Sequence, residues 1–323
     1  MIWFWRNRDT LSYSLNSFYK AIGISRQGVH DMLNRMQRNL EIEASMTQLI
    51  RMIREDHPTM SLRSMYYKIQ PTAMGRDRFE AMCVSYGYQV QRPANYKRTT
   101  DSSGVIRFPN RLEGLAVTHV NQVWVSDITY FEIANKYYYI TLILDAYSRF
   151  IKGYHVSRSM ETLDTTVPAL QMALKAEGLP RGIIMHSDGG GQYYSKAFLQ
   201  ITAKAGMENS MAKEAYENPQ AERINGTIKN NYLRHWAIHT FTHLENALDR
   251  AVVLYNFEKP HKSLHYLTPA QIEHSNYLYE EQTTDSKELF KGKKPSVGVF
   301  KPQLFKKAPS EPETNMVKLE TTS

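Results

Sequence analysis

Residues 121–145 are NQVWVSDITYFEIANKYYYITLILD. Two runs rich in β-branched and aromatic residues predict strands over 123–132 and 137–145, and the residues between them, 134–136, suit the turn of a hairpin. Asp127 lies inside the first of these strands. Because Asp is disfavoured in strands and a buried carboxylate needs partners, this residue is a candidate functional group.

The pattern downstream is typical of an α/β domain. A third strand is predicted over 150–156, and a helix over 162–176 whose regular part is expected to start nearer to Pro168, since proline disrupts a helix interior. The further predicted elements are a short buried strand at 182–186, a helix at 198–205, a strand at 207–211, and helices at 219–233 and 244–257. Three antiparallel strands followed by a helix and a parallel strand indicate an α/β fold with a mixed sheet.

Length and composition exclude several classes of protein. The chain has 323 residues, which suits two or three domains. Its single cysteine, Cys83, excludes a disulfide framework and favours a reducing compartment. No apolar run approaches the roughly 18 residues that a membrane span needs, so no membrane partner is expected. The histidines are scattered, so no zinc-ligand spacing is present.

The net charge of +8 is unevenly distributed along the chain. Residues 1–100 contain 15 Lys and Arg against 8 Asp and Glu, whereas residues 101–323 contain 25 against 24. A basic segment of this kind favours an anionic partner such as nucleic acid. The balanced remainder has room for functional carboxylates.

Residues 11–38 predict two short helices around a turn, the pattern of a helix-turn-helix. Gly23 ends the first helix and Ser25 caps the second. The outer face of the second helix would carry Arg26, Gln27 and His30, which are candidates for contact with DNA. A plain helical hairpin with a solvated polar face fits the same pattern, so both interpretations stay open.

A second helical group follows, with predicted helices at 42–55, 61–69 and 75–86. The basic residues on these elements are further candidates for DNA contact: Arg63, Lys68, Arg76 and Arg78. Two consecutive basic helical units favour a nucleic-acid face more strongly than either unit alone.

We therefore expect five parts along the chain. These are a helix-turn-helix-like segment at 1–40, a second helical DNA-binding segment at 41–91, a linker at 92–118, a catalytic core at 119–275 and a largely disordered tail at 276–323. The tail assignment follows from a composition rich in Lys, Glu, Ser and Pro with few apolar residues.

Two further carboxylates are candidate functional groups like Asp127. Asp188 comes directly after a predicted strand and before three glycines, and Glu222 lies in the first turn of the helix that opens at Pro219. Each has an ordinary structural explanation by itself, as a turn residue or as a partner of the helix dipole. Together they offer hard oxygen ligands suited to Mg²⁺. Lys229 lies two helical turns after Glu222, on the same face.

Residues 121–270 resemble the integrase catalytic core of DDE transposases and retroviral integrases, and most of all the second-frame transposase of the IS3 family of insertion sequences. The motifs that carry the resemblance are WVSDIT at 124–129, LDAYSR at 144–149, HSDGGGQY at 186–193, NPQAERINGTIK at 218–229, and YNFEKPHKSL at 255–264 followed by TPA. Ser25-Arg26 and the helices of residues 42–90 resemble the family's N-terminal DNA-binding segments.

The resemblance implies an RNase H-like fold with Asp127, Asp188 and Glu222 as the DDE triad, which would be both catalytic and metal-binding. Lys229 matches the basic residue that the family carries seven places after its Glu. Here 33 residues separate Asp188 from Glu222, slightly fewer than is usual in the family. Glu214 and Glu217 are the alternatives for the third carboxylate, but neither is followed by the helix and the lysine.

The implied reaction is metal-dependent DNA strand cleavage and strand transfer during transposition, with two Mg²⁺ ions, or Mn²⁺ in their place. The implied partners are double-stranded DNA of the element ends and the target, further copies of the chain, and a separate upstream-frame protein. The implied location is the cytoplasm, at the nucleoid when DNA is bound.

Two alternatives remain open. An RNase H-type nuclease could use the same core, although the basic helical N-terminus suits duplex DNA better. A catalytically decayed transposase could act as a DNA-binding repressor, although the three intact carboxylates argue against decay. A fourth acidic residue, Asp145, is expected to be structural, at a strand end beside Ser148 and Arg149.

Overall fold

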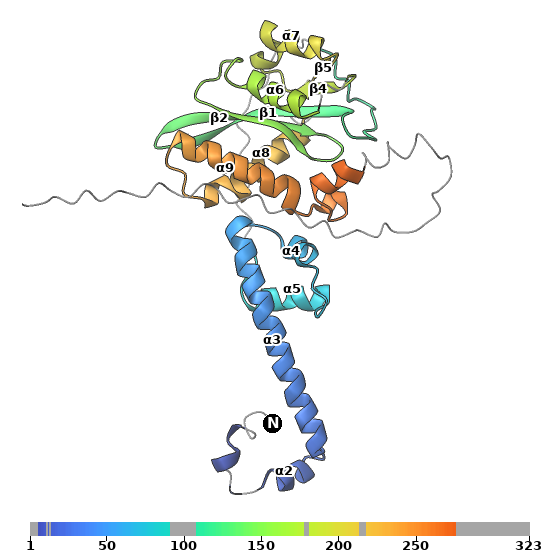
Figure 1. The fold of residues 1–323 in the computed structure, drawn as a ribbon, viewed down its shortest axis with the longest axis vertical. Coiled ribbons are helices and arrows are strands. Elements are labelled where there is room, and N and C mark those ends of the chain that lie inside the picture. The colour runs from blue at the N-terminus through green and yellow to red at the C-terminus, as the bar shows by residue number, and fades with distance from the viewer. Residues whose placement is uncertain are drawn as a thin grey trace, which may run out of the picture. The chain divides into compact units, whose positions relative to one another are not determined.

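The computed structural model describes residues 6–10, 12, 14–90, 108–177, 181–212 and 218–275. These residues form a helical N-terminal region and an α/β core (Figure 1). The part of the expected linker at 92–107, the expected tail at 276–323, and the alternative carboxylates Glu214 and Glu217 lie outside the described residues.

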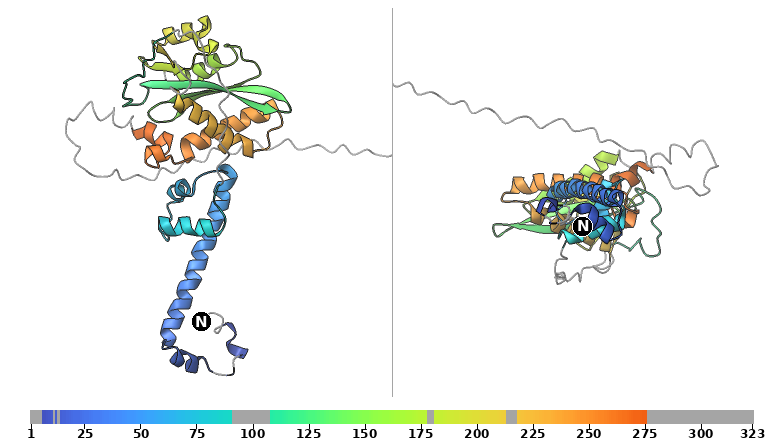
Figure 2. Two further views of the ribbon diagram at one scale, coloured as in Figure 1. Left: turned by 180° about the vertical axis from the view of Figure 1, so that it is seen from behind. Right: turned by 90° about the horizontal axis from the view of Figure 1, so that it is seen from below.

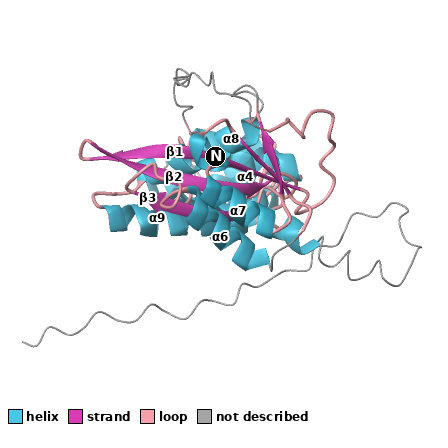
Figure 3. Cartoon of the chain, turned by 90° about the horizontal axis from the view of Figure 1, so that it is seen from above, coloured by secondary structure: helices cyan, strands magenta, loops and turns pink. Residues whose placement is uncertain are grey.

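The core is built on a five-stranded mixed sheet, in the order β3-β2-β1-β4-β5. The strands are β1 (Val123–Ile133), β2 (Lys136–Asp145), β3 (Ile151–Ser157), β4 (Ile184–Ser187) and β5 (Glu208–Met211). The pairs β1–β2 and β2–β3 are antiparallel, whereas β1–β4 and β4–β5 are parallel. Figure 3 shows β1, β2 and β3 side by side. The predicted mixed sheet is confirmed.

The hairpin between β1 and β2 turns where the sequence predicts. Ala134 and Asn135 have φ values of 47° and 60°, so the two central residues lie in the left-handed region. This is the backbone of a tight type I′ turn, whose twist matches that of the flanking strands. The turn fixes the register that pairs Asp127 with Leu142.

Helices cover both faces of the sheet, as Figures 1 and 2 show. One layer consists of α8 (Pro219–Asn231) and α9 (Phe241–Val253), and the other of α6 (Thr166–Glu177) and α7 (Lys196–Lys204). Val123 and Val125 pack in the α8 and α9 layer, whereas Trp124 packs in the α6 and α7 layer. Alternate residues of a strand point to opposite faces, so Asp127 belongs to the α8 face.

Short helical segments complete the core. They are the 3-10 turns η2 (Gly191–Tyr194), η4 (Leu233–His235) and η6 (Lys262–Leu264), the π-helix η5 (Leu254–Glu258), and helical residues at 269–275. Pro168 lies in the first turn of α6, as expected, because that turn needs no donor from its nitrogen.

The N-terminal region contains a 3-10 turn η1 (Arg8–Thr10) and the helices α2 (Leu15–Ala21), α3 (Arg26–Asp56), α4 (Leu62–Ile69) and α5 (Arg76–Ser85). Gly23 separates α2 from α3 with φ of 69°. The Ser25 hydroxyl accepts the Gly28 N–H at 3.0 Å and caps α3. The predicted break and the predicted cap are both confirmed.

The prediction of two separate helices within residues 25–55 is wrong, because α3 is a single helix of 31 residues (Figure 2). No Gly or Pro interrupts residues 29–56, so nothing in the backbone ends the helix near residue 40. The Gln37 amide also donates to the Glu41 carboxylate at 2.9 Å, one turn further along. The expected boundary between residues 40 and 41 therefore falls inside α3.

A separate small core joins the end of α3 to α4 and α5. Its buried members are Ile50, Met60, Met65, Met74, Phe79, Met82 and Cys83. The apolar side chains of residues 42–86 that suggested helical packing thus bury one another. Among the helices that the structure describes, none combines the length and apolar character that a membrane span requires.

Candidate active site

Two of the three predicted carboxylates are brought together by the pairing of β1 with β4. These strands are parallel, and their register ends with Ser126 opposite Ser187. Asp127 and Asp188 are the residues that follow this last pair on the two strands. Neighbouring strands lie about 4.8 Å apart. The fold therefore sets the two aspartates side by side, although 61 positions separate them in the sequence.

Asp127 is held by two neutral donors. Its Oδ1 accepts the Ile128 N–H at 2.8 Å, and its Oδ2 accepts Nδ2 of Asn225 from α8 at 2.8 Å. Burial and then the charge of Asp188 raise the pKa of Asp127 to about 7, against the two hydrogen bonds that lower it. Two carboxylates that share a site without a counter-charge repel each other in this way.

Asp188 opens the glycine-rich turn after β4. Its Oδ1 accepts the Gly190 N–H at 3.1 Å. Burial raises the pKa of Asp188, and this hydrogen bond opposes the rise. Within the described part of the chain, neither Asp127 nor Asp188 forms an ion pair with a lysine or arginine.

Glu222 is exposed in the first turn of α8. The helix packs on the sheet through Ala221, Ile224 and Ile228, which are almost fully buried. Glu222 lies three residues before Asn225, so both side chains leave the same side of the helix. The charge of Glu222 also contributes to the raised pKa of Asp127. The third predicted carboxylate is therefore within electrostatic reach of the first.

Lys229 is half-buried and lies against β1. Its Nζ donates to Thr129 Oγ1 at 2.5 Å and to the Tyr130 carbonyl at 3.4 Å, and it lies 5.1 Å from the centre of the Tyr130 ring. Burial and then the charge of Arg234 lower the pKa of Lys229, whereas Asp127 raises it. Lys229 of α8 is thus held against Thr129 of β1, two residues after Asp127 on that strand.

Several residues that support Asp127 are absent from the sequence predictions. The buried Tyr193 hydroxyl lies 2.9 Å from Ser126 Oγ, which itself donates to the Leu142 carbonyl at 2.9 Å. Asn218 donates to the Ser126 carbonyl at 3.0 Å. These contacts fix the backbone directly before Asp127. Asn225 could have been found from its i+3 spacing to Glu222, but no local pattern indicates Tyr193.

The oxygen atoms of Asp127, Asp188 and Glu222 suit a divalent cation, although Glu222 lies apart from the two aspartates. Among the described residues, no three His, Cys, Asp or Glu side chains stand together as a complete metal-binding group. Asp127 and Asp188 nevertheless supply oxygen ligands, which Mg²⁺ prefers, and their raised pKa values mark a place where a positive charge is favourable. Glu222 would complete the set by turning inward from α8.

The predicted DNA contacts at the start of α3 are exposed, as expected. Arg26, Gln27 and His30 all lie in the first one and a half turns of the helix. The Gln27 amide donates to Asp31 at 3.0 Å, so it is engaged within the helix. These three side chains form one small polar surface.

The basic residues of α4 and α5 are each paired with a carboxylate. The pairs are Arg63 with Glu80 at 2.8 Å, Lys68 with Glu258 at 2.7 Å, Arg76 with Asp77 at 2.9 Å and Arg78 with Glu43 at 3.4 Å. The three arginine side chains remain about 45% exposed, whereas that of Lys68 is only 23% exposed. Lys68 is therefore the weakest of these candidates for DNA contact.

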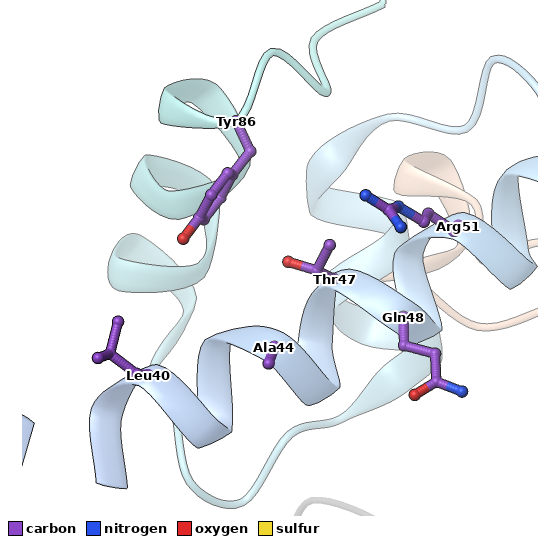
Figure 4. A pocket seen from close by; sticks show the side chains of 6 residues that line it. All are labelled: Leu40, Ala44, Thr47, Gln48, Arg51 and Tyr86. Carbon is purple, nitrogen blue, oxygen red and sulfur yellow. The ribbon is translucent and has the colours of Figure 1, made fainter. Parts of the chain in front are cut away.

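A shallow hollow of about 550 Å³ lies between α3 and the residue after α5 (Figure 4). Its walls are Leu40, Ala44, Thr47, Gln48, Arg51 and Tyr86. Arg51 is its only ionisable group besides the Tyr86 hydroxyl. The hollow thus has no carboxylates comparable to Asp127 and Asp188 and offers no comparable chemistry.

Comparison with known proteins points to one family. Two family models, both described as an integrase core domain, match residues 117–216 and 205–269. An uncharacterized 31 kDa protein of insertion element IS600 from Shigella sonnei is 28% identical over 78% of this chain and 95% of its own length.

Two further relatives are named as transposases. The transposase for insertion sequence element IS629 from Shigella sonnei is 33% identical over 56% of this chain, and transposase InsF for insertion sequence IS3A from Escherichia coli K12 is 30% identical over 48%. The matched segments span 61% and 55% of these two relatives.

Solved structures with partial similarity include two from retroviruses. The HTLV-2 integrase catalytic core domain in complex with magnesium is 20% identical, with a TM-score of 0.38 over 48% of this chain and 98% of that one. A simian T-cell lymphotropic virus intasome in complex with the PP2A regulatory subunit B56 gamma is 16% identical, with a TM-score of 0.42 over 76% of this chain and 77% of that one.

Proposed function

We propose that the chain is an insertion-sequence transposase of the IS3 type, and that it cleaves and joins DNA strands in a metal-dependent reaction. Its similarity to integrase core domains and to proteins named as transposases supports this proposal. The observation that supports this proposal most directly is the pair Asp127 and Asp188. The two carboxylates lie on neighbouring strands with raised pKa values, and neither forms an ion pair within the described residues, although the charge of Asp127 acts on Lys229.

Asp127, Asp188 and Glu222 are the proposed catalytic and metal-binding residues. They would hold one or two Mg²⁺ ions, which would stabilise the attacking and leaving oxygens of an in-line displacement. Asn225 and the Ile128 N–H orient Asp127 through both of its oxygens. Glu222, in the first turn of α8, would be the third ligand.

The proposed reaction consists of two phosphoryl transfers. In the first, water attacks a phosphodiester at the element end, so that one P–O bond forms as another breaks and a 3′-hydroxyl is released. In the second, that hydroxyl attacks a phosphodiester of another strand, so that a new P–O bond joins the two strands while one P–O bond of the attacked strand breaks and releases a 3′-hydroxyl there. Lys229, held beside β1, would place a positive charge near the phosphate backbone.

The proposed partners are the double-stranded DNA of the element ends and the target, further copies of this chain, and an upstream-frame protein. Arg26, Gln27 and His30 on α3, together with the exposed arginines of α4 and α5, are the proposed contacts outside the core. The division into a helical DNA-binding region, a linker at 92–118, a catalytic core at 119–275 and a tail at 276–323 also stays a proposal, without the boundary at residue 40 that falls inside α3. The proposed place of action is the cytoplasm, at the nucleoid.

A strand-joining assay tests the function. Labelled DNA from the ends that flank the gene and a plasmid target would be incubated with the full chain in Mg²⁺, Mn²⁺ or Ca²⁺. We expect joined products in Mg²⁺ and Mn²⁺, and none with Glu222→Gln. Glu132→Gln, the same change at an exposed glutamate at the far end of β1, should retain activity.

Other outcomes would redirect the proposal. Cleavage of RNA–DNA hybrids without joining would indicate a nuclease. Tight DNA binding with no metal-dependent reaction would indicate a decayed enzyme or a missing partner protein.

A further inference from the structure

A second group of charged residues lies in the layer of α8 and α9 and takes no part in the mechanism above. Arg149 comes from the turn between β2 and β3, Arg223 from α8, and Lys259 and His261 from the segment after the π-helix η5. Lys259 and His261 lie beside the buried ring of Tyr255, and the charges of Arg149 and Arg223 act on its hydroxyl. We refer to Arg149, Arg223 and Lys259 as the cationic cluster.

Ring distances and electrostatic effects connect all four groups to Tyr255. The His261 ring lies 4.6 Å from the Tyr255 ring, and Lys259 Nζ lies 5.9 Å from the Tyr255 ring centre. Burial raises the pKa of the Tyr255 hydroxyl, and the charges of Arg149 and Arg223 oppose that rise. The charges of both guanidinium groups therefore act on the same phenol.

The cationic cluster has no counter-charge of its own. Within the described residues, no Asp or Glu forms an ion pair with any of its three members. Asp145, whose charge acts on Arg149, already accepts the N–H groups of Asn121, Tyr147 and Ser148.

The environment of the cluster shows the same deficit of negative charge. Burial lowers the pKa of Lys259 to about 8, and burial together with the charge of Lys259 lowers the pKa of His261 to about 3. The Nε2 atom of His261 is buried and lacks a hydrogen-bond partner. Positive groups crowded in this way are stabilised by a bound anion.

The backbone holds the cluster in a fixed arrangement. Asn256 in η5 accepts the Ile151 N–H at 2.9 Å and donates to the Ile151 carbonyl at 3.1 Å, so the π-helix is fastened to β3. The Lys259 N–H then bonds to the Leu254 carbonyl at 3.0 Å. Arg149 adopts φ of 66°, an uncommon conformation for a residue with a side chain. Single π-turns of this kind often accompany functional sites.

We propose that Arg149, Arg223 and Lys259 form a phosphate-binding pocket that holds one phosphodiester of the DNA. This assignment rests on the proposed function of the core. Arginine matches phosphate oxygens with paired N–H donors, and lysine adds a compact charge. Arg223 is exposed on α8 and is therefore accessible to DNA.

The competing explanation is that Lys259 is structural, a cation resting on aromatic rings. Its Nζ also lies 5.9 Å from the Tyr232 ring. In that case Lys259→Met would destabilise the fold and leave the electrostatics of DNA binding unchanged. In a phosphate pocket, the same change removes an uncompensated charge, so the unfolding temperature should hold or rise while DNA binding weakens.

The test is DNA binding by the full chain as a function of salt, measured in Ca²⁺ with a labelled duplex from the element end. For Lys259→Met we expect about tenfold weaker binding and a slope of log Kd against log salt that is smaller by about 0.9, as for one lost phosphate contact. Lys204→Met, an equal charge change at the exposed end of α7, should have a much smaller effect. An unchanged slope for Lys259→Met would overturn the pocket.

Two further measurements keep this test separate from that of the function. A scan of duplexes with single neutral methylphosphonates should weaken wild-type binding at one position and leave Lys259→Met unaffected there; equal loss in both proteins would contradict the pocket. Lys259→Arg, which keeps the charge, should retain the wild-type slope. A normal slope for Lys259→Met with intact strand joining would refute only the pocket, whereas an altered slope without joining would refute only the proposed reaction.

Discussion

The core contains two groups of acidic residues whose surroundings differ in one decisive respect. Around Lys152, Nζ lies 2.7 Å from Glu177 Oε1 and 2.9 Å from Glu273 Oε2, and the lysine side chain is only 1% exposed. Where the pairing of β1 with β4 ends, Asp127 and Asp188 lie on neighbouring strands, and neither forms an ion pair within the described residues. We refer to these as the Lys152 network and the aspartate pair.

In the Lys152 network each acid has a hydrogen-bond or ion-pair partner, although burial still raises the pKa of Glu273. Asp145 accepts the N–H groups of Tyr147 and Ser148 through Oδ1 and that of Asn121 through Oδ2. The Ser148 hydroxyl reaches both Asp145 and Glu273. Asp145 is therefore structural, as its position at a strand end beside Ser148 predicts.

The aspartate pair, in contrast, has only neutral hydrogen-bond partners for its negative charge. Its partners are two backbone N–H groups and the amide of Asn225, all of them neutral. A carboxylate that brings its own counter-charge contributes to folding, whereas one that lacks it costs stability until a cation binds. The difference separates structural acids from functional ones more clearly than residue type does.

The largest effect is expected for Asp127→Asn. We expect strand joining to fall by more than about 10³-fold, because a ligand of the proposed ions is lost. The unfolding temperature should not fall, because the repulsion from Asp188 is removed and Asn225, whose Oδ1 has no partner, can turn that oxygen toward the new amide. Joining assays and thermal unfolding of the same preparation measure both effects.

The matched change in the other group is Asp145→Asn. It should lower the unfolding temperature, because the new amide cannot accept the bonds from Asn121, Tyr147 and Ser148 together. If Asp127→Asn unfolded the protein and Asp145→Asn left it unchanged, the assignment of the two groups would be reversed.

The next largest effect is expected for Lys152→Met. The substitution leaves Glu177 and Glu273 buried without their cation, which typically costs about 3–5 kcal/mol. Denaturant unfolding at neutral pH measures the loss. The double variant with Glu273→Gln should recover part of it, and a Lys152→Met protein as stable as the wild type would contradict the role given to the network.

The two groups also show what the sequence can and cannot reveal. Asp127 and Asp188 were recognisable because an Asp within a strand and an Asp before three glycines are local signals. The absence of a cation around them is a tertiary property. Lys68 shows the reverse problem: it is a basic helical residue in the sequence, yet its partner is Glu258, 190 positions away.

The same contrast holds for the fold. The β1–β2 hairpin was predictable because runs of β-branched and aromatic residues and turn residues are local signals, and the turn at Ala134 and Asn135 lies where they place it. The length of α3 was not, because the apolar pattern changes near residue 40 while the backbone has no reason to stop. Tyr193 could not be identified, since its role depends on Ser126, 67 positions away.

A smaller effect is expected for Asn225→Ala. Asn225 positions Asp127 and does not itself touch the reacting atoms, so joining should fall by about 10–100-fold. Because the loss acts through a metal ligand, the Mg²⁺ concentration for half-maximal rate should rise as well. A lower rate with unchanged Mg²⁺ dependence would show that Asn225 acts only on the structure, and Asn230→Ala on the same helix is the control.

The smallest expected effect concerns Glu258, which stands between the two extremes because it is 41% exposed and has partners. Contact with His57, whose Nε2 lies 3.6 Å away, and with Lys68 lowers the pKa of Glu258 to about 2, against burial, which raises it. An acid whose pKa is lower in the folded state stabilises the fold above its unfolded pKa of about 4.5, and this contribution disappears as the pH falls toward 2.

Unfolding of the wild type and Glu258→Gln at pH 6 and pH 3 measures this contribution. The wild type should be more stable at pH 6 by less than about 1 kcal/mol, since solvent screens a half-exposed pair, and the advantage should shrink at pH 3. Glu132→Gln, with no lysine beside it, should show no such change between the two pH values. If the difference between wild type and Glu258→Gln were equal at both pH values, charge would play no part, and Glu258 would bind Lys68 and His57 only as a polar neighbour.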